Sequence, residues 1–322
     1  MEAGSRKTLY VHIGLHKTGS TSLQNFLQLN EATLLAGGLY IPRSGRHQRE
    51  LTAPTIIHSH LSWQYLGRPL FDPAAGGLAE VQEEIETITT ARRFLLTDEG
   101  LSRIKEPAAF LANVPNHRVV VIACIRNPFS AAPSLYSEYL RFGTTVPFAT
   151  WLKGTGRAML NHGVIVKRWR QHAELRLIRV DEMGPDRSRI FELFLQALDH
   201  PADAMKYPET AQNMRCSMGE AAAMYYANRI LQKVDPEIHP DTRHRINQQI
   251  KEKLATHWPG PVQPYGLSSE EITALAAMFP TAAAKAPASE REPTPSLSDE
   301  QIAYVTKMVE EHMTQEYRRS PR

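Results

Sequence analysis

The feature that most constrains the fold is the run VVVIACI, residues 119–125, which is apolar at every position. A strand with one solvent-exposed face alternates apolar and polar side chains, whereas a strand that is covered on both faces stays apolar throughout. The run therefore predicts a parallel strand inside a sheet, with helices packed on both sides.

Segments elsewhere in the chain fit this arrangement. Further strand-like runs lie at residues 8–13, 93–97 and 175–180. Helix-like segments fall between them, at residues 20–30, 78–89, 129–142, 164–171 and 185–198. Strands that alternate with helices predict the α/β class, here a P-loop-type parallel β-sheet flanked by helices on both faces. Ligands of such sheets bind beyond the carboxyl ends of the strands.

The C-terminal part has a different pattern. After about Asp199 we predict only helices, at residues 217–232, 240–257, 268–279 and 298–317, and they either form a homodimer contact or cover the sheet. We expect a single domain over residues 1–322. Its parts are an α/β nucleotide-binding core (7–200), a helical part (201–280), a mobile Ala/Pro-rich linker (281–296) and a terminal helix (297–318). The Pro-, Gly- and His-rich residues 40–77 are predicted to be irregular.

Composition limits the classes of partner. The net charge of +3 is too small to indicate nucleic acid, but it suits a local pocket for a small anion. Only two cysteines are present, so a disulfide framework is not expected. No apolar run approaches the length of a membrane span, and the N-terminal MEAGSRKTLY lacks the apolar core of a signal peptide. We therefore expect a cytoplasmic protein.

The segment LYVHIGLHKTGSTSLQNFL, residues 9–27, predicts a strand, a glycine-containing loop and a helix. The free N–H groups and the dipole of a helix start favour an anion there. Gly14 and Gly19 permit the turn, and Lys17 adds a cation. Hydroxyl side chains follow at the helix start, at Ser20, Thr21 and Ser22. The ATP-binding pattern GxxxxGK[ST] places its lysine after the second glycine, so this loop is a poor match to that pattern.

A second anion site is predicted after the central strand. In VVVIACIRNPFSAAPS, Arg126 ends the strand and Ser134 lies eight residues further on, within the next predicted helix. A guanidinium group pairs with phosphate through two parallel hydrogen bonds, and a hydroxyl completes the shell of donors. The two motifs together predict a ligand with phosphate groups at two positions.

The run HKTGSTSLQ and the later Arg126–Ser134 pair resemble the two nucleotide-binding motifs of the sulfotransferases that use 3′-phosphoadenosine 5′-phosphosulfate (PAPS), in particular bacterial members of that family. The resemblance covers about residues 9–198. It implies transfer of a sulfuryl group from PAPS to an acceptor hydroxyl, of a carbohydrate or a small molecule, which leaves 3′-phosphoadenosine 5′-phosphate (PAP). Lys17 and the loop through Thr18, Gly19, Ser20, Thr21 and Ser22 would hold the phosphosulfate. Arg126 and Ser134 would hold the 3′-phosphate, and Arg215 is a further candidate contact.

The reaction also needs a general base. The resemblance implies a histidine or a glutamate. Glu99 follows the strand at 93–97, and His16 adjoins Lys17, so both are candidate catalytic residues. His47, His58 and His60 are weaker candidates for an acceptor pocket. No metal site is expected, because no group of ligands has a recognisable metal-binding spacing.

Two alternatives remain open. In a P-loop ATPase or kinase-like enzyme, Asp98 would hold magnesium and Glu99 would activate water. In a non-catalytic protein that binds PAP or another nucleotide, both phosphate motifs would persist without turnover, and the C-terminal helices would form an interaction module.

Overall fold

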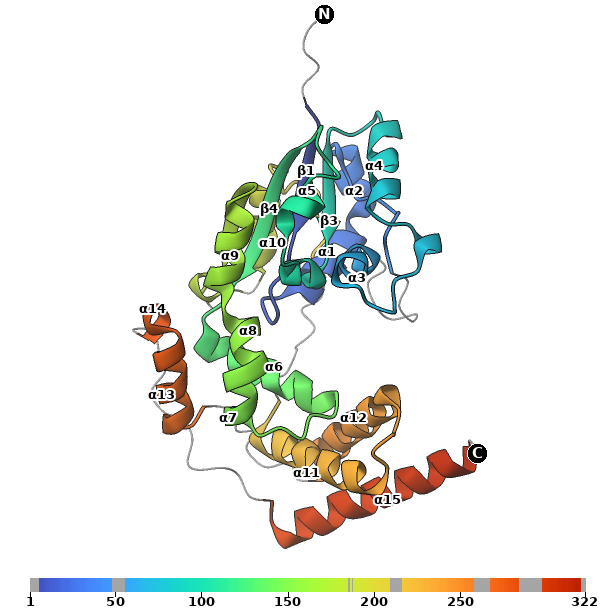
Figure 1. The fold of residues 1–322 in the computed structure, drawn as a ribbon, viewed down its shortest axis with the longest axis vertical. Coiled ribbons are helices and arrows are strands. Elements are labelled where there is room, and N and C mark those ends of the chain that lie inside the picture. The colour runs from blue at the N-terminus through green and yellow to red at the C-terminus, as the bar shows by residue number, and fades with distance from the viewer. Residues whose placement is uncertain are drawn as a thin grey trace, which may run out of the picture. The chain divides into compact units, whose positions relative to one another are not determined.

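The computed structural model describes residues 6–47, 56–184, 186, 188–208, 216–257, 267–283 and 297–319 (Figure 1). The chain forms two compact units. The first consists of Met1–Arg126 and Asn161–Gln212, and the second of Asn127–Leu160 and Asn213–Arg322. The candidate catalytic residues Lys17, His16 and Glu99 all belong to the first unit.

The first unit is built on a five-stranded parallel sheet with the strand order β2-β3-β1-β4-β5. The strands are β1 (Thr8–His12), β2 (Leu39–Tyr40), β3 (Arg93–Thr97), β4 (Arg118–Ile125) and β5 (Glu174–Arg179). In the register, His12 at the end of β1 pairs with Thr97 at the end of β3 and with Ile122 of β4. The loops that follow β1 and β3 therefore leave the same edge of the sheet side by side.

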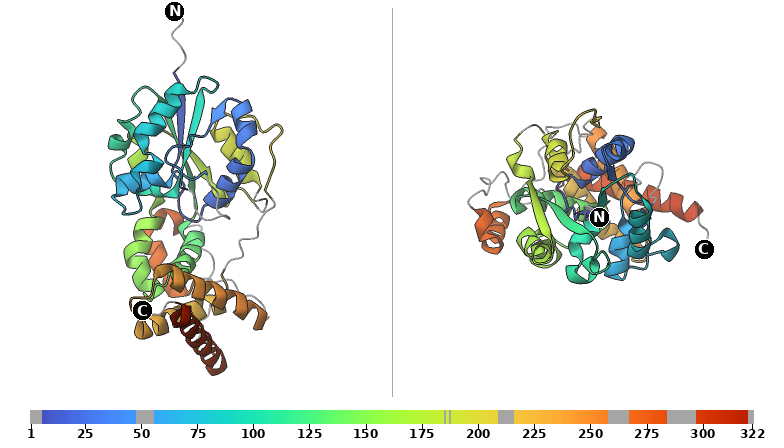
Figure 2. Two further views of the ribbon diagram at one scale, coloured as in Figure 1. Left: turned by 90° about the vertical axis from the view of Figure 1, so that its right-hand side faces the viewer. Right: turned by 90° about the horizontal axis from the view of Figure 1, so that it is seen from above.

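Helices cover both faces of this sheet (Figures 1 and 2). One face packs against α1 (Ser20–Leu29), α2 (Glu31–Ala36) and α10 (Arg189–Ala197). The other packs against α3 (Ser59–Leu66), α4 (Leu78–Thr87), α5 (Pro107–Leu111) and α9 (His162–Arg170). Both faces of β4 are consequently buried, because alternate residues of the strand enter different cores. The predicted α/β fold with helices on both faces is thus confirmed.

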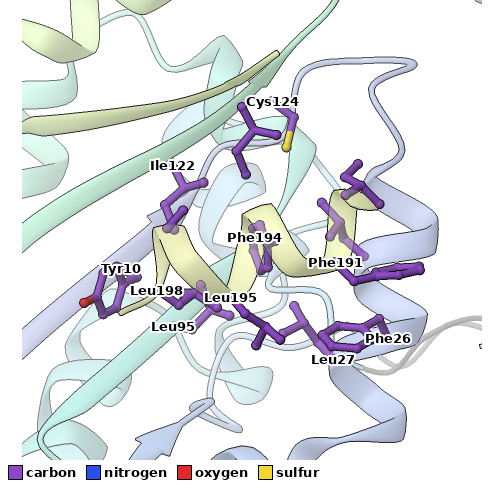
Figure 3. Packing of buried hydrophobic residues seen from close by; sticks show 14 of the residues in the cluster. Tyr10, Phe26, Leu27, Leu95, Ile122, Cys124, Phe191, Phe194, Leu195 and Leu198 are labelled. Atoms are coloured by element: carbon purple, nitrogen blue, oxygen red, sulfur yellow. The ribbon is translucent and has the colours of Figure 1, made fainter. Parts of the chain in front are cut away.

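The hydrophobic core that contains residues of α1 and α10 holds helix α1 in place against the sheet. Phe26 stacks on Phe191 with ring centroids 4.8 Å apart, and Phe194 is fully buried beside them (Figure 3). Leu23 and Leu27 lie on the same side of α1 and are fully buried as well. Burial of one such aliphatic or aromatic side chain contributes about 1.5–3 kcal/mol. The apolar side of α1 therefore anchors the helix whose N-terminus carries the loop.

Residues 40–77 differ from the irregular structure predicted for them. Within the described part of this segment, α3 spans Ser59–Leu66 and a short 3₁₀ helix, η1, spans Pro73–Ala75. Apolar and polar side chains alternate over most of α3, so its sequence shows no clear helical period. Tertiary contacts stabilise it instead, since Leu61 is fully buried against the second core.

The second unit is helical. It contains α6 (Pro128–Arg141), α7 (Phe148–Trp151), a π-helical turn η3 (Leu152–Gly156), α8 (Arg157–Leu160), α11 (Met218–Val234), α12 (Pro240–His257), α13 (Ser269–Met278), α14 (Pro280–Ala283) and α15 (Asp299–Arg319). Asn228 of α11 donates to the carbonyl oxygens of Leu140 and Thr144, which caps the end of α6. No strand lies beyond Asp199 in the residues described, as the sequence predicts.

Two buried histidines brace the loops at the edge of the sheet. His12 Nδ1 lies 2.8 Å from Thr97 Oγ1. His58 accepts a hydrogen bond from Thr97 N through Nδ1 at 3.1 Å, and its Nε2 donates to Pro42 O at 2.9 Å. Burial lowers the pKa of His12 to about 4 and that of His58 to about 3. Both rings are therefore neutral in the folded protein near neutral pH.

We expect the free energy of unfolding to fall as the pH drops from about 6.5 towards about 4. An unfolded histidine has a pKa of about 6.5, so in this window the unfolded chain binds protons that the folded chain excludes. Each of the two histidines should contribute about 1.4 kcal/mol per pH unit. Urea unfolding across the window measures the slope. His58→Gln keeps an amide donor for Pro42 O but does not titrate, so it should flatten the slope; an unchanged slope would exclude His58 as a source of the effect.

Candidate functional site

The loop between β1 and α1 has an unusual backbone. Lys17 has φ 62° and Gly19 has φ 91°, so both lie in the left-handed region. A non-glycine residue rarely adopts this conformation, which costs of order 1 kcal/mol or more and is typical of functional loops. The buried Thr18 holds the turn by donating from Oγ1 to Leu15 O at 2.5 Å. Helix α1 then begins at Ser20, with its unpartnered N–H groups at the loop.

The predicted catalytic residues His16 and Glu99 are in contact. His16 Nδ1 lies 3.3 Å from Glu99 Oε2, and the two side chains are 21% and 33% exposed. Glu99 reaches the loop because it begins η2 (Glu99–Arg103), close behind strand β3. Burial alone would raise the pKa of Glu99, but His16, with Ser20 and Lys17, outweighs burial and holds that pKa below its usual range. The carboxylate is therefore ionised at neutral pH.

The other ring nitrogen of His16, Nε2, is buried and has no hydrogen-bond partner among the described residues. No hydrogen-bonding atom of the described residues reaches His16 Nε2, although this atom is closed off from solvent. A buried polar atom without a partner costs about 1–3 kcal/mol. Such atoms are rare in native proteins, and a molecule bound at the site can supply the missing hydrogen bond.

Gly14 allows the side chain of Glu99 to lie over the loop. A Cβ atom at this position would come within 2.7 Å of Ser20 Oγ and 3.2 Å of Glu99 Cγ. Real Cβ atoms almost never approach other heavy atoms as closely as the first of these distances. Glycine is therefore needed here for lack of space.

Gly14→Ala should destabilise the protein by ~1–3 kcal/mol, the usual cost of an overpacked site, and should disturb the His16–Glu99 contact. We also expect weaker binding of PAP, measured by calorimetric titration, because Ser20 at the start of α1 must shift. Gly219→Ala is the matched control, since a Cβ there would meet nothing within 4 Å. Equal PAP affinity in the two variants would show that the loop tolerates the displacement.

Arg126 lies against the same loop. Its Nη1 donates to Lys17 O at 3.1 Å, and its Nε lies 3.7 Å from Asp181 Oδ1. Its side chain is 18% exposed. The residue follows β4, which is the neighbour of β1, so its position results from the strand order. Arg126 thus links the loop after β1 with the end of β5, and its guanidinium group brings positive charge to this edge of the sheet.

His162 is a site residue that the sequence did not identify. Its Nδ1 accepts a hydrogen bond from Arg126 N at 3.4 Å, so in the neutral ring Nε2 carries the proton. Within the described part of the chain, the buried Nε2 has no partner. Burial, with a smaller contribution from His16, lowers the pKa of His162 to about 4. No sequence pattern marks this residue, because Asn161 before it, which caps α9 by accepting from Val164 N, signals only the start of a helix.

The remaining predicted residues are not all brought to this place. Thr21 is exposed and Ser22 half-buried at the start of α1. Ser134 lies on α6 in the second unit, and Arg215 lies outside the described residues.

The three histidines considered for an acceptor pocket have other contacts. His60 and His47 pack on Trp63, with ring centroids 5.0 and 4.6 Å away, and His58 hydrogen-bonds to Thr97 N and Pro42 O. The described residues hold no cluster of metal-ligating side chains, and none of their helices is long and apolar enough to cross a membrane.

The comparisons with known proteins give a structural likeness but no match by sequence. No family model matches the sequence, and no curated protein matches it. Among solved structures, the crystal structure of a sulfotransferase from Alicyclobacillus acidocaldarius is similar, with 16% sequence identity and a TM-score of 0.42, over 71% of this chain and 96% of that chain. Likeness at this level assigns no family, ligand or residue role to the present chain.

Proposed function

We propose that this protein is a sulfotransferase that moves a sulfuryl group from PAPS to an acceptor hydroxyl and releases PAP. The observation that carries the proposal is the loop between β1 and α1. Lys17 precedes Gly19, both residues have left-handed backbones, and Arg126 binds the carbonyl oxygen of Lys17. A loop of this kind, at the start of a helix, is suited to a phosphosulfate. The sequence resemblance to PAPS-dependent enzymes supports the same ligand.

In the proposed reaction, the acceptor oxygen attacks sulfur in line with the departing phosphate. A new sulfur–oxygen bond forms while the bond from sulfur to the bridging oxygen breaks, and PAP leaves with the electron pair. Negative charge therefore builds on the bridging oxygen. The ammonium group of Lys17 and the N–H groups at the start of α1 neutralise that charge. The acceptor's proton passes to the pair formed by His16 and Glu99, which lie 3.3 Å apart.

The second phosphate of the donor would be held by Arg126; Ser134, which follows it in the sequence motif, belongs to the second unit. Arg126 is well suited to this role, because its side chain is largely buried and carries a fork of donors. His162, which hydrogen-bonds to the backbone of Arg126, presents a neutral N–H donor to the same region. A dianionic phosphate can accept from both side chains.

We further propose that the acceptor is a carbohydrate or small-molecule hydroxyl and that the enzyme acts in the cytoplasm. A transferring sulfuryl group carries less charge than a terminal phosphoryl group. Transfer is therefore proposed to proceed without the magnesium ions that kinases use to neutralise phosphates.

Nucleotide competition tests the donor. By calorimetric titration, PAP should bind in the absence of magnesium, and ATP with magnesium should fail to displace it. Tight binding of ATP–Mg²⁺ that PAP cannot displace would favour the ATPase alternative, in which Asp98 and Glu99 hold the metal and the attacking water. PAP binding with no transfer to any acceptor would leave a nucleotide-binding interaction protein.

A further inference from the structure

We infer that His16 is the base that takes the acceptor's proton, and that Glu99 is a positioning residue that holds the His16 ring. The inference rests on the proposed sulfuryl transfer and assigns separate roles to the two members of the pair. It starts from their contact, 3.3 Å between Nδ1 and Oε2, and from the buried Nε2 that no described residue reaches.

The contact with Glu99 determines which nitrogen of the neutral His16 ring carries the proton. An ionised carboxylate can only accept hydrogen bonds, so Glu99 Oε2 requires a proton on His16 Nδ1. In the neutral imidazole, Nε2 then carries a lone pair and can only accept. Glu99 therefore fixes which nitrogen of His16 acts as the base, in the way that carboxylates orient other catalytic histidines.

Because Nε2 of the neutral His16 ring can only accept a hydrogen bond, its partner must be a donor. The oxygens of the phosphosulfate are acceptors and cannot satisfy another acceptor. An acceptor hydroxyl carries a proton and can donate it to Nε2. His162 has the opposite polarity, because its Nδ1 accepts from Arg126 N and its buried Nε2 carries the proton. Of these two histidines, His16 is thus matched to the acceptor and His162 to an anionic oxygen.

Proton affinity favours the same division of roles. A general base works best when its pKa lies near the working pH. Glu99 is a weaker base than an ordinary glutamate, because His16 and Lys17 hold its pKa down against the effect of burial. The Glu99 carboxylate can instead stabilise the imidazolium that forms when His16 takes the proton.

Atoms and charge balance in this step. The acceptor oxygen forms its bond to sulfur, PAP leaves with the electron pair of the broken bond, and the acceptor's proton moves to His16 Nε2. His16 then holds both ring protons and a positive charge beside Glu99. The proton leaves His16 before the next turnover, after the products have departed and water has entered the emptied site.

The first test needs no substrate. In the full-length protein with carbon-labelled histidine, the NMR titration of His16 should move to lower pH in Glu99→Gln, because the carboxylate that favours the imidazolium is lost. The other titratable groups that act on this pair are Lys17 in the loop, His162 on α9 and His12 at the end of β1, and all three remain in the variant. An unshifted His16 titration would overturn the positioning role of Glu99, whether or not PAPS is the donor.

The second test uses labelled PAPS with methyl glucoside and 4-nitrophenol as acceptor probes. His16→Asn should lower transfer to the sugar by about 10²–10⁴-fold, the usual contribution of a general base. Transfer to 4-nitrophenol should change by less than about tenfold at mildly alkaline pH, because this phenol is already ionised and needs no base. In Glu99→Gln, the acidic limb of the pH profile should move to lower pH. Glu99→Asp, which retains the carboxylate, should preserve most of the activity.

The double variant separates the two roles. If Glu99 acts through His16, adding Glu99→Gln to His16→Asn should reduce sugar transfer no further. Near-normal transfer in His16→Asn, combined with its loss in Glu99→Gln, would identify Glu99 as the base and overturn the inference. If the unmodified protein does not bind PAP, the proposed function and the base role of His16 are both overturned. The NMR titration still shows, independently of PAP, whether Glu99 acts on His16.

Discussion

Lys17→Ala is expected to lower the rate of sulfuryl transfer by about 10²–10³-fold, the usual effect of removing one group that stabilises transition-state charge. PAP affinity should fall by less than about tenfold. The difference arises because full charge on the bridging oxygen develops only as the bond to sulfur breaks. Single-turnover transfer from labelled PAPS, combined with calorimetric titration of PAP, measures the two effects separately.

Two variants control for other causes. Lys17→Met keeps most of the side chain's length without its charge, so it should reproduce the loss in Lys17→Ala. Lys105→Ala removes an exposed lysine elsewhere in the first unit and should change neither quantity. Equal losses of transfer and of PAP affinity in Lys17→Ala would mean that Lys17 contributes to ground-state binding alone.

Arg126→Ala should remove the preference of the protein for PAP over AMP, which lacks the 3′-phosphate. Hydrogen bonds to charged groups contribute about 1.5–3 kcal/mol each, so we expect a loss of about 100-fold in PAP affinity. AMP affinity should fall by less than about tenfold, through the lost contact with Lys17 O. Competition titrations with the two nucleotides give both values.

Arg170→Ala is the matched control, because Arg170 is an exposed arginine in the last turn of α9 in the same unit. Arg126→Lys should recover part of the PAP affinity but not all of it, since a lysine keeps the charge and loses the planar fork. If PAP and AMP weaken equally in Arg126→Ala, Arg126 does not read the 3′-phosphate, and its contact with the loop would be its main contribution.

Much of the fold follows from local sequence patterns. The continuous apolar run of β4 and the strong apolar stripe of α1 predicted both elements to within about a residue of their observed ends. Strand β2 was missed because it has only two residues, Leu39 and Tyr40, which is too short to show a period. Helix α3 was missed because packing of Leu61, rather than its own sequence, stabilises it.

The residues of the loop between β1 and α1 could be predicted from the sequence, but the contacts between residues distant in the sequence could not. The glycines, lysine and hydroxyls of the loop are adjacent in sequence and carry a recognisable pattern. The pairing of His16 with Glu99 depends on the strand order, which places β3 beside β1, and no local pattern of a single sequence fixes that order. The role of His162 depends likewise on β4 and α9 meeting at Arg126 N.

Transfer of label from sulfur-labelled PAPS tests the central claim most directly. The unmodified protein is incubated with labelled PAPS and a pool of sugars, alcohols and phenols, without added metal, and the sulfated product and PAP are separated and counted. We predict that labelled ester and PAP appear in equal amounts, and that Lys17→Ala nearly abolishes both. PAPS that binds and is recovered unchanged with every acceptor, or label that is transferred equally well by Lys17→Ala, would contradict the account.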